Sequence, residues 1–114
     1  MTSYNMQTPY AITCPECGGA LFPISLQPTP QFRCHIGHIL SPESMMESQL
    51  KRLEVTLSAV MVIIKERSEL CRQLQRCEAL DRHTAKAMID EADERANQVK
   101  ALLELPWAHV PEAL

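Results

Sequence analysis

Two cysteine-containing turns constrain this chain more than any other feature of its sequence. The first reads Cys-Pro-Glu-Cys-Gly-Gly and supplies Cys14 and Cys17. The second follows after sixteen residues, reads Cys-His-Ile-Gly-His, and supplies Cys34 and His38. Thiolate sulfur and imidazole nitrogen are the ligands that Zn²⁺ prefers, and four of them close a tetrahedral site with no position left for water. The sequence therefore predicts that Cys14, Cys17, Cys34 and His38 bind one structural zinc ion.

The residues beside the cysteines favour the same interpretation. A turn that wraps a metal needs its backbone N–H groups to point at sulfur, and Gly18, Gly19 and Gly37 allow this tight geometry. The alternatives are chance cysteines or a disulfide, but five cysteines suit metal ligands and buried thiols in a reducing compartment better. His35 competes with His38 as the fourth ligand, and we expect it to point elsewhere.

Prolines and glycines divide the chain into two parts. All three glycines and six of the eight prolines lie within the first 42 residues, whereas residues 43–105 contain neither. The first part contains strand-like segments, which are residues 10–13, 20–26 and 31–34, with a turn at 27–30. These strands bury too little surface to fold alone, so we expect zinc binding to supply folding energy.

The resulting expectation is a small α+β fold, in which an N-terminal zinc ribbon precedes a long α-helical hairpin or coiled coil. The expected boundaries are a flexible N-terminus at 1–8, the ribbon at 9–41, the helical part at 42–105 and a C-terminal tail at 106–114.

The helical part begins with a good N-cap, Ser41, followed by Pro42 at the first helical position. A strict 4-3 spacing then visits ten positions, eight of them apolar, as in a coiled-coil or bundle interface. These positions are Met46, Leu50, Leu53, Leu57, Val60, Ile64, Arg67, Cys71, Leu74 and Glu78.

A break near residues 78–84 is expected to end this helix, and Asp81 or Thr84 suits the cap of a second one. The apolar positions of the second helix are Ala85, Met88, Ala92, Ala96, Val99 and Leu103, with Leu102 beside them, and its opposite face is acidic. One continuous helix remains the alternative. We favour the hairpin, because a lone helix would leave its apolar face in water.

Residues 59–64 are six consecutive apolar residues, which cover the whole circumference of a helix. A helix that is apolar all round is buried on several sides, and one partner helix covers only part of it. We therefore expect a homo-oligomer formed through helix 42–77. The alternative is burial within the hairpin of a single chain.

Composition narrows the functional classes. The formal net charge of −3 and the pI near 5.8 argue against bulk attraction to nucleic acid or to an anionic membrane. No signal peptide pattern is visible, and the longest apolar run is too short to span a bilayer. We expect a cytoplasmic protein that does not contact membrane. No acid near the cysteines pairs with a general base, so we do not expect an enzyme.

The motifs resemble a known domain, the zinc-ribbon-plus-helices C-terminal extension of chemotaxis-type protein-glutamate methylesterases. The similar stretches are CPECGGAL at 14–21, FRCHIGH at 32–38, SPESM at 41–45, LEVTLSAVM at 53–61 and KERSELCRQL at 65–74. The resemblance covers about residues 14–103 and implies that Cys14, Cys17, Cys34 and His38 are the metal ligands.

The chain also departs from this pattern. The family's esterase domain, with its catalytic Ser, His and Asp, has no counterpart in these residues, so no methylesterase activity is implied. The family commonly has Trp where this chain has Ser58 and Arg where it has Val62. The helix surface is therefore more apolar in this chain than in the family. This indicates that another chain covers the surface that the missing esterase domain would cover.

These observations favour a non-enzymatic, zinc-binding regulatory or adaptor module that self-associates through its helices and binds an unknown protein partner, in a bacterial signalling context. A nucleic-acid-binding or transcription-associated zinc ribbon is the alternative. It needs a basic surface, and the ribbon offers only Arg33.

Overall fold

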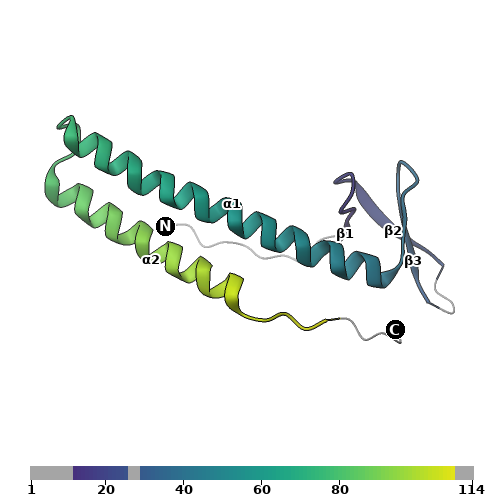
Figure 1. Cartoon of the computed structure of the whole chain (residues 1–114). Coiled ribbons are helices and arrows are strands. Elements are labelled where there is room, and N and C mark those ends of the chain that lie inside the picture. The colour runs from purple at the N-terminus through teal and green to yellow at the C-terminus, as the bar shows by residue number, and fades with distance from the viewer. Residues whose placement is uncertain (1–11, 26–28, 110–114) are drawn as a thin grey trace. The chain divides into compact units, whose positions relative to one another are not determined.

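The computed structural model describes residues 12–25 and 29–109 (Figure 1). Within them the chain forms a four-stranded antiparallel sheet followed by two helices, which confirms the small α+β fold. The elements are β1 (Ile12–Thr13), β2 (Ala20–Ser25), β3 (Gln31–Cys34), β4 (Ile39–Leu40), α1 (Pro42–Arg76) and α2 (Arg82–Glu104). The expected flexible segment 1–8, the ends of two predicted strands and part of the 27–30 turn lie outside the described residues.

The structure divides into two compact units. The first, which we call the sheet unit, contains the described residues from 12 to 50 together with His109. The second, the hairpin unit, contains residues 51–108.

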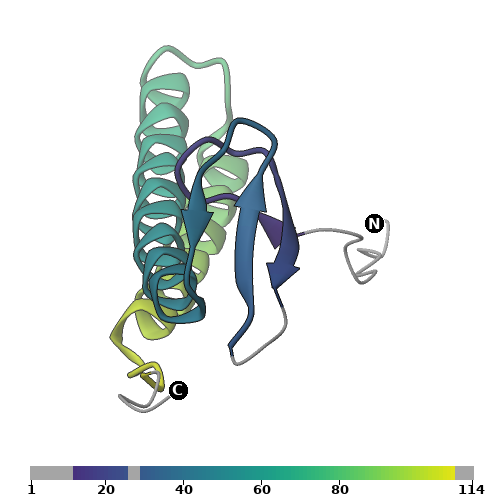
Figure 2. The ribbon, with the colours of Figure 1, turned by 90° about the vertical axis from the view of Figure 1, so that its right-hand side faces the viewer.

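The sheet is a simple meander in the order β1-β2-β3-β4, with every neighbouring pair antiparallel (Figure 2). The described parts of the three predicted strands form β1, β2 and β3. The fourth strand was not predicted, because Ile39–Leu40 is too short to show an alternating pattern. It pairs with β3 through Phe32 and Arg33.

One face of the sheet carries the small core of this unit. The register sets Leu21 opposite Cys34 and Phe32 opposite Leu40, so these side chains share a face. The first turn of α1 adds the buried Met45, and the core cluster is Cys14, Leu21, Cys34, Leu40 and Met45, with Phe32 packed against it. Two of its five buried members are Cys14 and Cys34, so the core includes two of the four predicted metal ligands.

The start of α1 follows the predicted capping pattern. The backbone N–H of Ser44 donates to Ser41 Oγ at 3.2 Å, and the N–H of Met45 donates to the Ser41 carbonyl at 3.0 Å. This cap positions Met45 over the sheet.

The chain turns between two separate helices, so the alternative of one continuous helix is wrong. After α1 ends, Glu78 adopts a left-handed conformation with φ of 64°, and the N–H of Ala79 donates to the Leu74 carbonyl at 2.9 Å. This is the pattern in which a glycine usually ends a helix. Asp81 then caps α2 by accepting the N–H of Thr84 at 3.0 Å. The two helices lie side by side in opposite directions (Figure 1).

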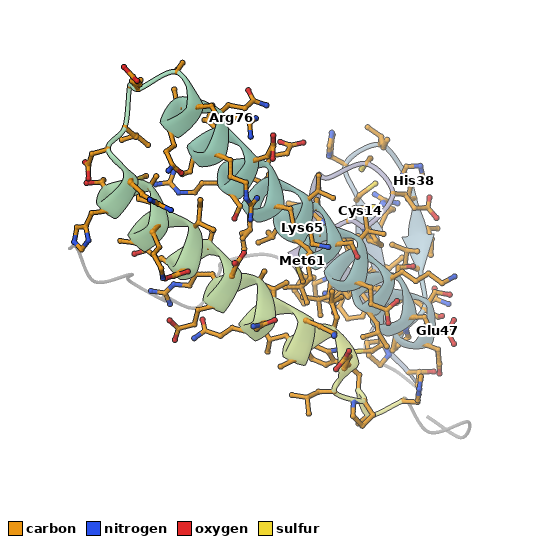
Figure 3. The ribbon with its side chains drawn as sticks, turned by 60° about the vertical axis from the view of Figure 1, so that its left-hand side comes forward. Cys14, His38, Glu47, Met61, Lys65 and Arg76 are labelled. Atoms are coloured by element: carbon orange, nitrogen blue, oxygen red, sulfur yellow. The ribbon has the colours of Figure 1, made fainter. Side chains whose placement is uncertain are left out.

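The shielded side of α1 in the hairpin unit differs in part from the predicted spacing. Its buried and half-buried apolar and small residues are Leu57, Met61, Ile64, Ser68, Cys71 and Leu74. Figure 3 shows Met61 on the side of α1 that faces α2. The strict 4-3 spacing placed Leu53, Val60 and Arg67 here instead, and all three are exposed. The physical reason is that a straight helix with 3.6 residues per turn drifts from a 3.5-residue repeat.

The predicted apolar positions of α2 are confirmed, with one addition and one correction. Ala85, Met88, Ala92, Ala96, Val99 and Leu103 are buried or half-buried, and Ile89 joins them. Leu102 is exposed. The acidic residues Asp90, Glu91, Asp93 and Glu94 are exposed, as expected of a solvated face. No helix within the described residues has the length and apolar character needed to cross a membrane.

Candidate metal centre

The four predicted ligands come together at one end of the sheet. One ligand atom from each of Cys14, Cys17, Cys34 and His38 lies within 4.8 Å of all the others. His38 Nδ1 is 3.8 Å from Cys14 Sγ and 3.4 Å from Cys34 Sγ, and Figure 3 shows Cys14 and His38 together. In a tetrahedral site with bonds of about 2.0–2.3 Å, neighbouring ligand atoms are about 3.5 Å apart. The cluster therefore has the size that can hold a metal ion.

Two similar backbone turns present these ligands. In the first, the N–H of Gly18 donates to the Cys14 carbonyl at 2.9 Å. In the second, the N–H of Gly37 donates to the Cys34 carbonyl at 3.0 Å. Both glycines have positive φ, 78° and 100°, which other L-residues adopt at a steric cost. The expectation that glycine shapes both turns is confirmed at these two positions.

Gly19 has a different role. The His35 ring occupies the space that a Cβ at position 19 would need, so any side chain there would displace the ring. His35 is exposed and does not belong to the ligand cluster. The expectation that it points elsewhere is therefore confirmed.

Glu16 is a neighbour of the site that sequence reasoning missed. Its Oε2 lies 3.6 Å from His38 Nε2, while Nδ1 of the same ring faces the cysteine sulfurs. A carboxylate at the far nitrogen of a metal-binding histidine fixes the orientation of the ring. The available signal was its position between Cys14 and Cys17, inside the first turn.

Hydrogen bonds to sulfur favour the thiolate form at two of the three cysteines. Burial raises the pKa of Cys34, but the backbone amides of Ile36 and His38 outweigh it and lower the pKa from 9.0 to about 6. Burial likewise raises the pKa of Cys14, but amide hydrogen bonds near the first turn bring it below its usual value.

The other two ligands shift in the opposite direction. The Gly19 amide lowers the pKa of Cys17, but burial and the neighbouring Cys14 and Cys34 sulfurs raise it overall. The hydrogen bond with Cys14 raises the pKa of His38, and nearby negative charge adds to the effect. Relative to the isolated side chains, the cluster therefore favours the thiolate form at Cys14 and Cys34 and the protonated form at Cys17 and His38.

The remaining described cysteines and histidines do not belong to this four-residue cluster. Cys71 is buried in the hairpin unit, as expected for a structural thiol, and Cys77 is exposed. His83 and His109 are exposed. Among residues 12–25 and 29–109, the cluster of Cys14, Cys17, Cys34 and His38 is the one group of these residue types arranged to hold a metal.

Comparison of the chain with protein-family models, with curated proteins and with solved structures finds no match. The resemblance to the methylesterase extension therefore stays a prediction.

Proposed function

We propose that this chain is a non-enzymatic, zinc-binding regulatory or adaptor module that self-associates through α1 and binds a protein partner, in a bacterial signalling context. One observation carries the proposal. A four-ligand cluster of the size of a closed metal site is joined to a helix that keeps a broad apolar surface exposed.

The donor set supports zinc as the metal. Three thiolates and one imidazole are soft or borderline ligands, and a tetrahedral arrangement of such ligands is typical of Zn²⁺. A structural role follows from the same set, because four protein ligands leave no coordination position for water or substrate. The small core of the sheet unit supports this role, since metal binding would add folding energy that five buried side chains do not supply.

The exposed surface of α1 supports self-association. It lies on the side of the helix opposite the one shielded in the hairpin unit. We call it the α1 ridge, and its members are Val55, Ala59, Val62, Ile63, Glu66 and Leu70. Val55 is 70% exposed, Ile63 63%, Val62 54% and Leu70 53%. Large contiguous apolar surfaces on soluble domains are commonly interaction sites.

Metal analysis and light scattering test the proposal together. We expect the purified chain to contain one zinc ion and to elute, at tens of micromolar, with a mass of two or more chains by size-exclusion chromatography with multi-angle light scattering. The mass should fall on dilution if the association is reversible. A zinc-loaded strict monomer would overturn the self-association part of the proposal, and a chain with no affinity for zinc would overturn the metal part.

Zinc affinity is expected to decrease as the pH falls. A plot of the logarithm of the affinity against pH should become steeper below about pH 6. A ligand that carries a proton in the metal-free state must release it on binding. The pKa of Cys17 is raised from 9.0, so this thiol releases a proton on binding at neutral pH and below. The raised pKa of His38 extends its proton release to higher pH, and Cys34, with a pKa of about 6, adds a further proton below that pH. Competition titrations with a chromophoric chelator from about pH 8 to about pH 5, corrected for proton binding by the chelator, measure the slope. A slope that stays constant over this range would contradict the expectation.

A further inference from the structure

Two exposed surfaces of this chain have the same layout and opposite charge. The first is the outer face of the sheet. The register sets Phe22 opposite Arg33 and Arg33 opposite Ile39, so one row of side chains crosses β2, β3 and β4 with the arginine in the middle. Phe22 is 56% exposed and Ile39 58%, and the exposed Ile24 lies beside them at the bulge in β2. A lone cation therefore lies among large apolar side chains.

The second surface is the α1 ridge, where the single charge is negative. Val62 and Ile63 lie one helical turn before Glu66, and Leu70 lies one turn after it. All four are exposed. The nearest basic neighbours in the sequence, Lys65 and Arg67, project about 100° to either side of Glu66 and lie off the ridge.

The dimensions of the two rows also agree. Neighbouring strands are about 4.8 Å apart, so the row from Phe22 to Ile39 spans about 10 Å. On the helix, Leu70 lies about 12 Å along the axis from Val62. In both rows the charge lies near the centre with apolar side chains about 5–6 Å to each side.

Neither charge has a partner among the residues that the structure describes. Glu69, one turn from Glu66, accepts from Arg76 at 3.4 Å, whereas no ion pair within residues 12–25 and 29–109 includes Glu66 or Arg33. In the sheet unit, the carboxylate of Glu16 lies beside the metal cluster and faces His38 rather than Arg33.

We propose that the outer face of the sheet binds the α1 ridge of a second copy of this chain, with Arg33 paired to Glu66 of the partner subunit. The inference rests on the proposed function, because it assigns the two surfaces through which self-association occurs. An arginine–carboxylate pair forms two parallel hydrogen bonds, and the apolar residues around it exclude water.

Charge complementarity selects this pairing over contact between two ridges. A ridge that meets another ridge offers Glu66 no cation and, in a parallel arrangement, sets two carboxylates opposite each other. The pairing of sheet and ridge joins two different surfaces. If the sheet of each copy binds the ridge of the other, the two copies form a closed two-fold dimer that contains two such contacts.

A charge swap tests the pairing by analytical ultracentrifugation of the zinc-loaded full chain. We expect Arg33→Glu and Glu66→Arg each to raise the dissociation constant of self-association by about tenfold or more. The double variant Arg33→Glu/Glu66→Arg should return it to near the wild-type value. A mixture of the two single variants should associate as well, since both contacts of a dimer with one copy of each variant then join opposite charges.

Arg67→Glu is the matched control, because it reverses an exposed charge next to Glu66 but off the ridge, and its dissociation constant should stay near that of the wild type. Zinc stoichiometry and circular dichroism establish that each variant is folded. If the wild type associates but Arg33→Glu has no effect, the pairing is overturned while the proposed function stands. If the wild type is monomeric, both are overturned. Failure of the double variant and of the mixture to recover association also overturns the pairing.

Discussion

Replacing Cys34 by serine is expected to unfold the sheet unit and release its zinc, while the hairpin unit keeps its helices. Cys34 is 2% exposed, belongs to the core cluster and provides one of the four ligand atoms. The hydroxyl of serine stays protonated at neutral pH and is a poor zinc ligand. The substitution therefore removes a metal bond and leaves a polar group in the core at once.

Zinc content should fall from one ion per chain to less than about a tenth, because binding free energy and folding free energy are the same quantity in a small metal-stabilised domain. Amide spectra of ¹⁵N-labelled protein would show the loss residue by residue. Signals from β2 and β3 should collapse to unfolded positions, whereas those of α2, which has its own shielded face, should remain. Removal of zinc from the wild type by a strong chelator should have the same effect.

Cys77→Ser is the matched control. This thiol is exposed and lies outside the metal cluster, so its replacement should leave both zinc content and spectrum unchanged. Full zinc binding by the Cys34→Ser chain, or wild-type β2 and β3 signals that survive chelation, would contradict a structural metal.

Replacing Ile63 by aspartate is expected to dissociate the self-associated protein into monomers. Ile63 is 63% exposed within one chain, so the substitution should have little effect on the fold of the monomer. In an interface the same side chain would be buried. A carboxylate in its place would be desolvated and would lie one helical turn from the carboxylate of Glu66, and both effects oppose association.

We expect the dissociation constant to rise by about 30-fold or more, the change expected of a central interface residue. Light scattering over a dilution series measures it. Leu102→Asp is the control, since it makes the same kind of change at an exposed leucine on α2, away from the ridge. An Ile63→Asp chain with the wild-type mass, or equal dissociation by both variants, would exclude the α1 ridge as the specific interface.

Local patterns accounted for much of the fold. The caps Ser41 and Asp81 were recognisable because a capping side chain bonds to a backbone N–H only three residues away. The metal ligands were recognisable for a similar reason. Each turn presents two ligands within a few residues, and the glycines expected to allow these tight turns include Gly18 and Gly37, which adopt positive φ.

The features that sequence reasoning missed depend on contacts between distant segments. The strand β4 exists because β3 pairs with it, and two residues carry no periodicity of their own. Glu16 joins the site because the second turn brings His38 within 3.6 Å of it, across more than twenty residues of sequence.

The sequence by itself determined which residues form the candidate metal site and where the helices begin and end, because these properties depend on chemistry within a few residues. Only the tertiary structure decided which side of α1 is covered. The six apolar residues of positions 59–64 point in every direction, and the packing of α2 shields Met61 and Ile64 while Val62 and Ile63 stay exposed. One neighbouring helix shields only part of another helix's circumference, so the residues it leaves uncovered form the ridge.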